Sequence, residues 1–286
     1  MKTETAPGLP ADWLNGWLAA VGIAVLLPDV RLSWTSDAKP VAVFHASWSS
    51  PLAERIVAAL PNEAELEQSC LATLSRRVSL PAFRDAAKKS RATHDTTLAP
   101  SLTDLLSGKS FRDGDLPHGA FDPPMPAGVT LLQRVVTCRR LLAQDAQKRL
   151  VGTLAGAPLR ERANGLGFDI LRLPTGVQPD AAVMTDPAVE CLCFAALTLF
   201  PVRGDGRRAL QRGWTKPATM RGALTWPVWR EPLEVWGVDA LLDQFYAQPA
   251  ESAQRLNGIS GAFASVPFEG TGSSDPTRGY ASERIA

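Results

Sequence analysis

Histidine is the side chain most often used for metal ligation and for general base catalysis. The chain has three, His45, His94 and His118, and none stands at metal-ligand spacing from another histidine or from a cysteine. His94 precedes Asp95, a pair that can act as a general base. A His-Asp pair in a polar loop is more often solvated surface, so we predict neither a metal site nor a histidine-based catalytic site.

The four cysteines form no recognisable framework. Cys191 and Cys193 are separated by one residue inside an apolar run, whereas Cys70 and Cys138 are isolated. A zinc site would need two close Cys or Cys/His pairs, and a disulfide framework would need closer spacing and a secretory signal. We therefore expect buried free thiols in a reducing compartment.

Motifs for nucleophilic catalysis and for phosphate binding are also missing. The sequence has no Gly-x-Ser-x-Gly elbow and no P-loop. The glycine-rich residues 164–168, NGLGF, lack the Lys-Ser/Thr pair of a P-loop, and they precede a predicted strand, whereas a dinucleotide fingerprint follows one. We expect no enzymatic activity and no cofactor, and hence a protein that works by binding.

Positive charge is concentrated in three segments of a chain whose formal net charge is only +1. Residues 76–91 and 203–221 each contain six basic residues against one aspartate, and residues 134–149 contain five against one. If these segments meet in space they form a groove for phosphates; the alternative is a set of solvated helix faces. The predicted nucleic-acid-binding residues are Arg76, Arg77, Lys88, Lys89, Arg91, Arg139, Arg140, Arg207, Arg208 and Arg212.

Eight tryptophans against two tyrosines are an unusual balance. Core packing is the ordinary role of tryptophan, and stacking on nucleic-acid bases is the functional alternative. An exposed apolar patch built from Trp13 and Trp17 would instead indicate a protein-interaction module.

A helix over residues 12–27 is the clearest predicted element. Apolar side chains recur every four residues along it, and the carboxylate of Asp12 can cap its first turn. Gly16 and Gly22 each cost about 1 kcal/mol of helix stability relative to alanine. Glycines inside so apolar a helix indicate that another element approaches closely.

The remaining elements follow from alternation, periodicity and start signals. Asn62 is a predicted helix cap, and the Asp186-Pro187 pair marks a helix start. Strands are predicted at residues 30–35, 41–45, 168–173, 208–214 and 222–226, and helices within residues 51–91 and at 129–146, 186–200 and 238–246.

Together these elements predict an α+β fold, mostly helical, with helices packed on small antiparallel sheets. Two of the helices are followed by strands, which allows a degenerate helix-strand-strand internal repeat; two unrelated helices followed by strands are the alternative. We expect an N-terminal α+β unit at residues 1–110, a C-terminal α+β unit at residues 128–248 and a partly disordered tail at residues 249–286.

No apolar run reaches the ~20 residues that a helix needs to cross a bilayer. The longest early run is Trp17 to Leu27, and no signal-peptide core follows the N-terminus. We expect a cytoplasmic protein that has no contact with membranes.

Three segments resemble a known family. Residues 11–22, ADWLNGWLAAVG, are similar to the first helix of certain CRISPR-associated proteins. Residues 186–201 and residues 224–233, which begin LTWPVW, add to the likeness. Together the segments resemble subunits of the type I-U (type I-G) CRISPR interference complexes, either the large subunit or an accessory one.

The resemblance implies a non-catalytic subunit of an antiviral ribonucleoprotein, with other subunits of the complex and guide RNA and/or target DNA as partners. It covers about a third of the chain and carries over no recognition residues, so the basic residues named above rest on charge alone. The alternative function is a protein-interaction or scaffold module that has no nucleic-acid contact.

Overall fold

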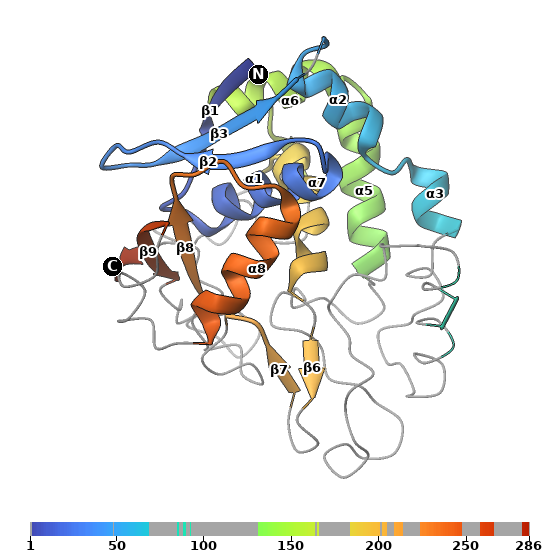
Figure 1. Cartoon of the computed structure of the whole chain (residues 1–286). Helices are drawn as coiled ribbons and strands as arrows, with labels where there is room; N and C mark the ends of the chain where they lie inside the picture. The colour runs from blue at the N-terminus through green and yellow to red at the C-terminus, as the bar shows by residue number, and fades with distance from the viewer. Residues whose placement is uncertain are drawn as a thin grey trace, which may run out of the picture.

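The computed structural model describes residues 2–47, 49–68, 85, 88–89, 92, 131–163, 165, 184–200, 202–204, 209–213, 224–247, 258–265 and 282–285. These residues form an α+β fold in which helices account for more residues than strands, and the sheets are small and antiparallel (Figure 1). The predicted fold class is confirmed, and the internal repeat stays a prediction. Within the described residues, no helix has both the length and the apolar character that a membrane span requires.

The first sheet has the strand order β1-β3-β2. Its strands are β1 (Lys2–Pro10), β2 (Arg31–Trp34) and β3 (Val41–Ala46), and β2 and β3 agree with the prediction. The strand β1 was not predicted, because Pro7, Gly8 and Pro10 are typical of loops. The pairing of β1 with β3 is regular up to Ala6 and then shifts register, so both prolines fall where the regular ladder has ended.

The second large sheet has the order β10-β9-β8. Its strands are β8 (Thr225–Trp229), β9 (Ile259–Ser265) and β10 (Ser282–Arg284). The strands β9 and β10 lie in the segment 249–286, which we expected to be a partly disordered tail. Most of the rest of that segment lies outside the described residues, so its partial disorder stays a prediction. Two short hairpins complete the strands: β4 (Glu161–Arg162) with β5 (Met184–Thr185), and β6 (Val202–Gly204) with β7 (Ala209–Gln211).

The helices α1 (Leu14–Leu26) and α7 (Pro187–Ala196) lie against each other at the centre of the molecule (Figure 1). The close approach that the glycines of α1 predicted is confirmed at Gly22, which packs on the main chain of α7. The prediction that Asp12 caps α1 is wrong, because no side chain caps this helix. Asp12 lies in the turn that follows β1, a strand that we did not predict.

Two local start signals are confirmed. Asp186 accepts a hydrogen bond from the amide of Ala188 at 3.0 Å, and Pro187 occupies the first position of α7. Asn62 and Glu65 form a reciprocal capping box at the start of α3 (Glu63–Gln68), with distances of 2.9 and 2.7 Å.

The other helices surround the α1–α7 pair. They are α2 (Leu52–Ala59), α5 (Leu131–Ala143), α6 (Ala146–Ala155) and α8 (Val235–Tyr246), and a short 3-10 turn (Leu197–Leu199) follows α7. The single helix predicted at residues 129–146 is therefore two successive helices, and the second one extends further along the chain than expected.

Tryptophans join the two ends of the chain in one hydrophobic core. The indole N–H groups of Trp17, Trp226 and Trp229 donate to main-chain oxygens of Pro227, Ala11 and Leu32, at 2.9, 2.7 and 2.8 Å respectively. Both predicted units contribute side chains to this core. The boundary expected between residues 110 and 128 lies outside the described residues, so the division into units stays a prediction.

Candidate nucleic-acid interface

Arg139 and Arg140, two of the predicted nucleic-acid-binding residues, lie on α5 and face α3. The Nε of Arg139 donates to the main-chain oxygen of Pro61 at 2.7 Å, and Arg140 forms an ion pair with the carboxylate of Glu63. The hydrogen bond from Arg140 holds the pKa of Glu63 below its usual value. Both arginines therefore attach α5 to the start of α3.

Arg212 follows β7 and is turned into the protein, with 9% of its side chain exposed. Its guanidinium contacts Asp239 at 2.5 Å, Asp243, and the main-chain oxygen of Leu199 at 2.9 Å. These contacts bind the turn to α8. A phosphate would have to displace two carboxylates to reach Arg212, so the observed role of this residue is structural.

The remaining predicted contacts are only partly described. Lys88 and Lys89 are exposed and helical. Arg139 and Arg140 contact Pro61 and Glu63, whereas Arg212 contacts α8, and Figure 1 shows α7 between α5 and α8. Contact between the predicted basic residues and nucleic acid stays a prediction. Five further predicted contacts lie outside the described residues: Arg76, Arg77, Arg91, Arg207 and Arg208.

Four of the described tryptophans are buried: Trp17, Trp34, Trp226 and Trp229. Their rings pack on one another or on phenylalanine, so they cannot stack on bases. Trp17 of α1 is fully buried and donates to Pro227 of β8, so it does not form an exposed apolar patch with Trp13, as the interaction-module alternative would require. A different tryptophan, Trp236 in the first turn of α8, is 75% exposed.

A serine–histidine pair crosses the first sheet. The Oγ of Ser33 lies 2.8 Å from Nε2 of His45, and the Oγ1 of Thr3 lies 3.3 Å from its Nδ1. Such a pair can form an activated nucleophile. Ser33 is only 4% exposed, however, and Thr3 stands where a triad has a carboxylate. The pair therefore links β1, β3 and β2, while burial lowers the pKa of His45.

The thiols agree with the prediction where they are described. Cys138, Cys191 and Cys193 are free and buried, and burial raises the pKa of Cys191 to about 12. Within the described part of the chain, no group of three or more His, Cys, Asp or Glu side chains is arranged to hold a metal ion. The positions of Cys70, His94 and His118 lie outside the described residues.

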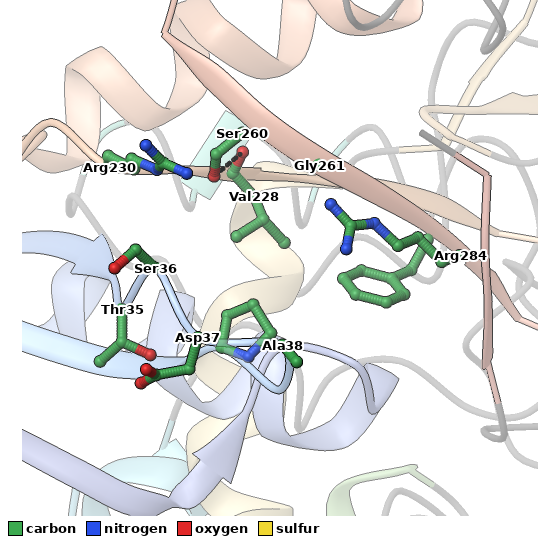
Figure 2. A pocket seen from close by; sticks show the side chains of 11 residues that line it. Thr35, Ser36, Asp37, Ala38, Val228, Arg230, Ser260, Gly261 and Arg284 are labelled. Carbon is green, nitrogen blue, oxygen red and sulfur yellow. Dashed lines mark hydrogen bonds between the residues drawn. The ribbon is translucent and has the colours of Figure 1, made fainter.

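A concave site lies between the turn that joins β2 to β3 and one face of the second sheet (Figure 2). It encloses about 110 Å³, and we call it the arginine pocket. The turn contributes Thr35, Ser36, Asp37, Ala38 and Pro40, and the sheet side contributes Val228, Arg230, Ser260, Gly261, Phe263 and Arg284.

Strand register explains the shape of the arginine pocket. Val228 stands opposite Gly261, and Phe263 stands opposite Arg284. Since side chains two residues apart on a strand share a face, these four positions look toward the turn. Gly261 has no side chain, which leaves a recess between Val228 and Phe263. Arg230 follows the end of β8 and completes the rim.

The arginine pocket contains two guanidinium groups and one carboxylate, that of Asp37. Arg230 is exposed, and no hydrogen bond or ion pair joins it to another residue in the described part of the chain. By contrast, five other arginines are held in ion pairs: Arg31, Arg55, Arg140, Arg149 and Arg212. Arg230 and Arg284 were not among the predicted site residues, because neither belongs to a dense basic segment.

In comparisons with known proteins, no family model, no curated protein and no solved structure matches the chain. No site residue is therefore transferred from a relative.

Proposed function

We propose that the chain is a non-catalytic, nucleic-acid-associated subunit of a CRISPR-type antiviral ribonucleoprotein complex. The observation that carries the proposal is the convergence of the three segments that resemble this family, residues 11–22, 186–201 and 224–233. They are widely separated in sequence, yet α1 packs on α7. In addition, Trp17 donates a hydrogen bond to Pro227 of β8, and Ala11 accepts one from Trp226 of β8. The likeness therefore falls on one packed unit and not on scattered apolar runs.

The charge distribution is compatible with such a role. A net charge of +1 gives little long-range attraction to nucleic acid, so contact must come from local groups. Subunits of guide-RNA complexes leave sequence reading to base pairing and hold the backbone. A cation such as Arg230, which has no partner within the described residues, suits that task better than one already engaged with a carboxylate.

The test is a pull-down of the tagged full chain from its native host, with sequencing of the bound nucleic acid and identification of the bound proteins. We expect repeat-derived guide RNA and a constant set of partner proteins. Nuclease treatment before a second purification separates direct protein partners from those bridged by RNA. Recovery of the chain without any nucleic acid would overturn the proposal.

A second candidate function is a protein-interaction module that has no nucleic-acid contact, and Trp236 favours it. The side chain of Trp236 is 75% exposed, and tryptophan is among the residues most enriched at binding hot spots. It lies beside Glu234, whose ion pair with Arg31 attaches the start of α8 to the first sheet. This candidate predicts that partner proteins survive nuclease treatment and that Trp236→Ala releases them.

A further inference from the structure

We propose that the arginine pocket binds one phosphate group of a nucleic-acid backbone. The inference rests on the proposed function, because it names the place where the chain touches nucleic acid. A cavity of about 110 Å³ is small, and it admits a single compact group more readily than a whole nucleotide. The predicted ligand is therefore one phosphodiester of a strand that runs across the mouth of the pocket.

Arg230 is the cation of the pocket that has no partner among the described residues. Its charge is not compensated by any described residue, so binding a phosphate displaces no internal carboxylate. A guanidinium also donates two parallel hydrogen bonds that match the oxygens of a phosphate. Arg212 has the same chemistry but is already engaged with Asp239 and Asp243, which is why the pocket is the better candidate.

Other hydrogen-bond donors line both walls of the arginine pocket. Figure 2 shows Arg230 and Arg284 on the sheet wall, with Val228 between them and residues Thr35 to Ala38 on the opposite wall. The Oγ1 of Thr35 accepts a hydrogen bond from the amide of Val41 at 3.1 Å, which leaves its hydroxyl proton for another acceptor. The hydroxyl of Ser36 lines the same wall. Donors on both walls can therefore surround an anion.

The pocket has no aromatic face to offer a base. Phe263 is only 6% exposed, and its ring is stacked on Trp226 with a centroid distance of 6.1 Å. Recognition in this pocket therefore depends on charge and not on base identity. It follows that binding should be similar for different sequences and should weaken steeply with added salt.

Asp37 makes the inference sharper. Its carboxylate is the only acidic group that lines the pocket in the described part of the chain, and it repels an anion. Removing the charge of Asp37 should tighten binding, whereas removing the charge of either arginine should weaken it. If the arginines affected binding only through folding, removing the charge of Asp37 would not be expected to change the affinity in the opposite direction.

The experiment measures fluorescence anisotropy of labelled single-stranded RNA and DNA of mixed sequence with the full chain, at several salt concentrations. Arg230→Ala and Arg284→Ala should each lower affinity roughly tenfold and reduce the slope of log affinity against log salt by about 0.7. Asp37→Asn should raise affinity. The matched control is Arg162→Ala on β4, since Arg162 is also exposed without a described partner.

A filling variant, Gly261→Val, tests the recess without changing charge. The φ angle of Gly261 is not positive, so a side chain is compatible with its backbone. We expect weaker binding, with the melting temperature of each variant measured to confirm folding. Affinities of Arg230→Ala and Arg284→Ala equal to that of the Arg162→Ala control would overturn the inference.

Three further outcomes separate the sources of phosphate and the two proposals. Stabilisation of the wild-type chain by inorganic phosphate, together with no binding of RNA or DNA strands, would also overturn the inference. If guide RNA co-purifies with the chain but both arginine variants bind strands normally, the pocket is wrong and the proposed function stands. If strands bind through both arginines but no guide RNA co-purifies, the pocket stands and the CRISPR assignment fails.

Discussion

Gly22 of α1 lies directly on the main chain of Leu192 in α7. A Cβ atom built on Gly22 would overlap the carbonyl oxygen of Leu192 and lie 2.8 Å from its carbonyl carbon. Both obstructing atoms belong to the backbone, so they cannot turn aside as a flexible side chain can. The separation of the two central helices is therefore set by the missing side chain at Gly22.

The variant Gly22→Ala should lower the free energy of unfolding by about 2 kcal/mol, because forced separation of the helices outweighs the gain in helix propensity of about 1 kcal/mol. Urea unfolding followed by circular dichroism measures the change. Gly237→Ala in α8 is the matched control, since its Cβ would meet only the side chain of Leu233, at 3.4 Å. Equal stabilisation of the two variants would contradict the packing described here.

His45 should make the protein less stable in mild acid. Burial lowers the pKa of His45 from 6.5, so the unfolded chain binds a proton at a pH where the folded chain does not. The free energy of unfolding should therefore fall as the pH is lowered from about 6.5 toward the pKa of the folded state. Arg31, opposite His45 on β2, has its charge paired with Glu234. His45→Gln should lose this pH dependence in urea unfolding between pH 7.5 and 5.5, and an unchanged dependence would contradict the assignment.

Arg212 should matter for stability. Replacing Arg212 with glutamine removes two ion pairs and leaves the carboxylates of Asp239 and Asp243 without their cation. Because the two aspartates are 36% and 64% exposed, we expect a loss of roughly 2 kcal/mol, below that of a fully buried pair. Lys88→Gln is the charge-matched control and should unfold like the wild type. If Arg212→Gln leaves the unfolding midpoint unchanged, the observed contacts do not stabilise the turn.

The buried thiols should be inert in the folded protein. Burial raises the pKa of Cys191 to about 12, and the Sγ of Cys193 donates to the main-chain oxygen of Asn15 at 3.3 Å. In a Cys70→Ser background, an aromatic disulfide reagent should react with the three remaining thiols only after denaturant is added. The reaction is monitored by absorbance. If any of these thiols reacts rapidly in the native protein, the α1–α7 region opens readily.

Local signals made part of the fold predictable. Asp186 and Asn62 each cap a helix by bonding to a main-chain amide two or three residues further along the chain, and both caps are observed as expected. The strands β2 and β3 followed from alternation of apolar and polar residues. By contrast, β1 and β9 contain residues typical of loops or flexible tails, and only pairing with partners distant in sequence makes them strands.

The candidate site was not predictable for a related reason. Density of basic residues led to Arg139, Arg140 and Arg212, but in the fold Arg140 and Arg212 pair with carboxylates and Arg139 donates to a main-chain oxygen. Arg230 and Arg284 stand alone in the sequence and meet at one pocket through the pairing of three strands. Charge density in a sequence does not reveal that a cation such as Arg230 has no acidic partner among the described residues.

The dependence of α1 on distant partners also affects synthesis on the ribosome. The helix α1 ends at Leu26, whereas α7 begins at Pro187, so about 160 residues are added before its main partner exists. At 5–20 residues per second this takes roughly 10–30 s. During that interval the nascent chain contains an almost wholly apolar helix whose largest packing partner is still missing, although β1, β2 and α2 have already been made. We expect chaperones that bind exposed apolar segments to associate with the nascent chain until α7 has emerged.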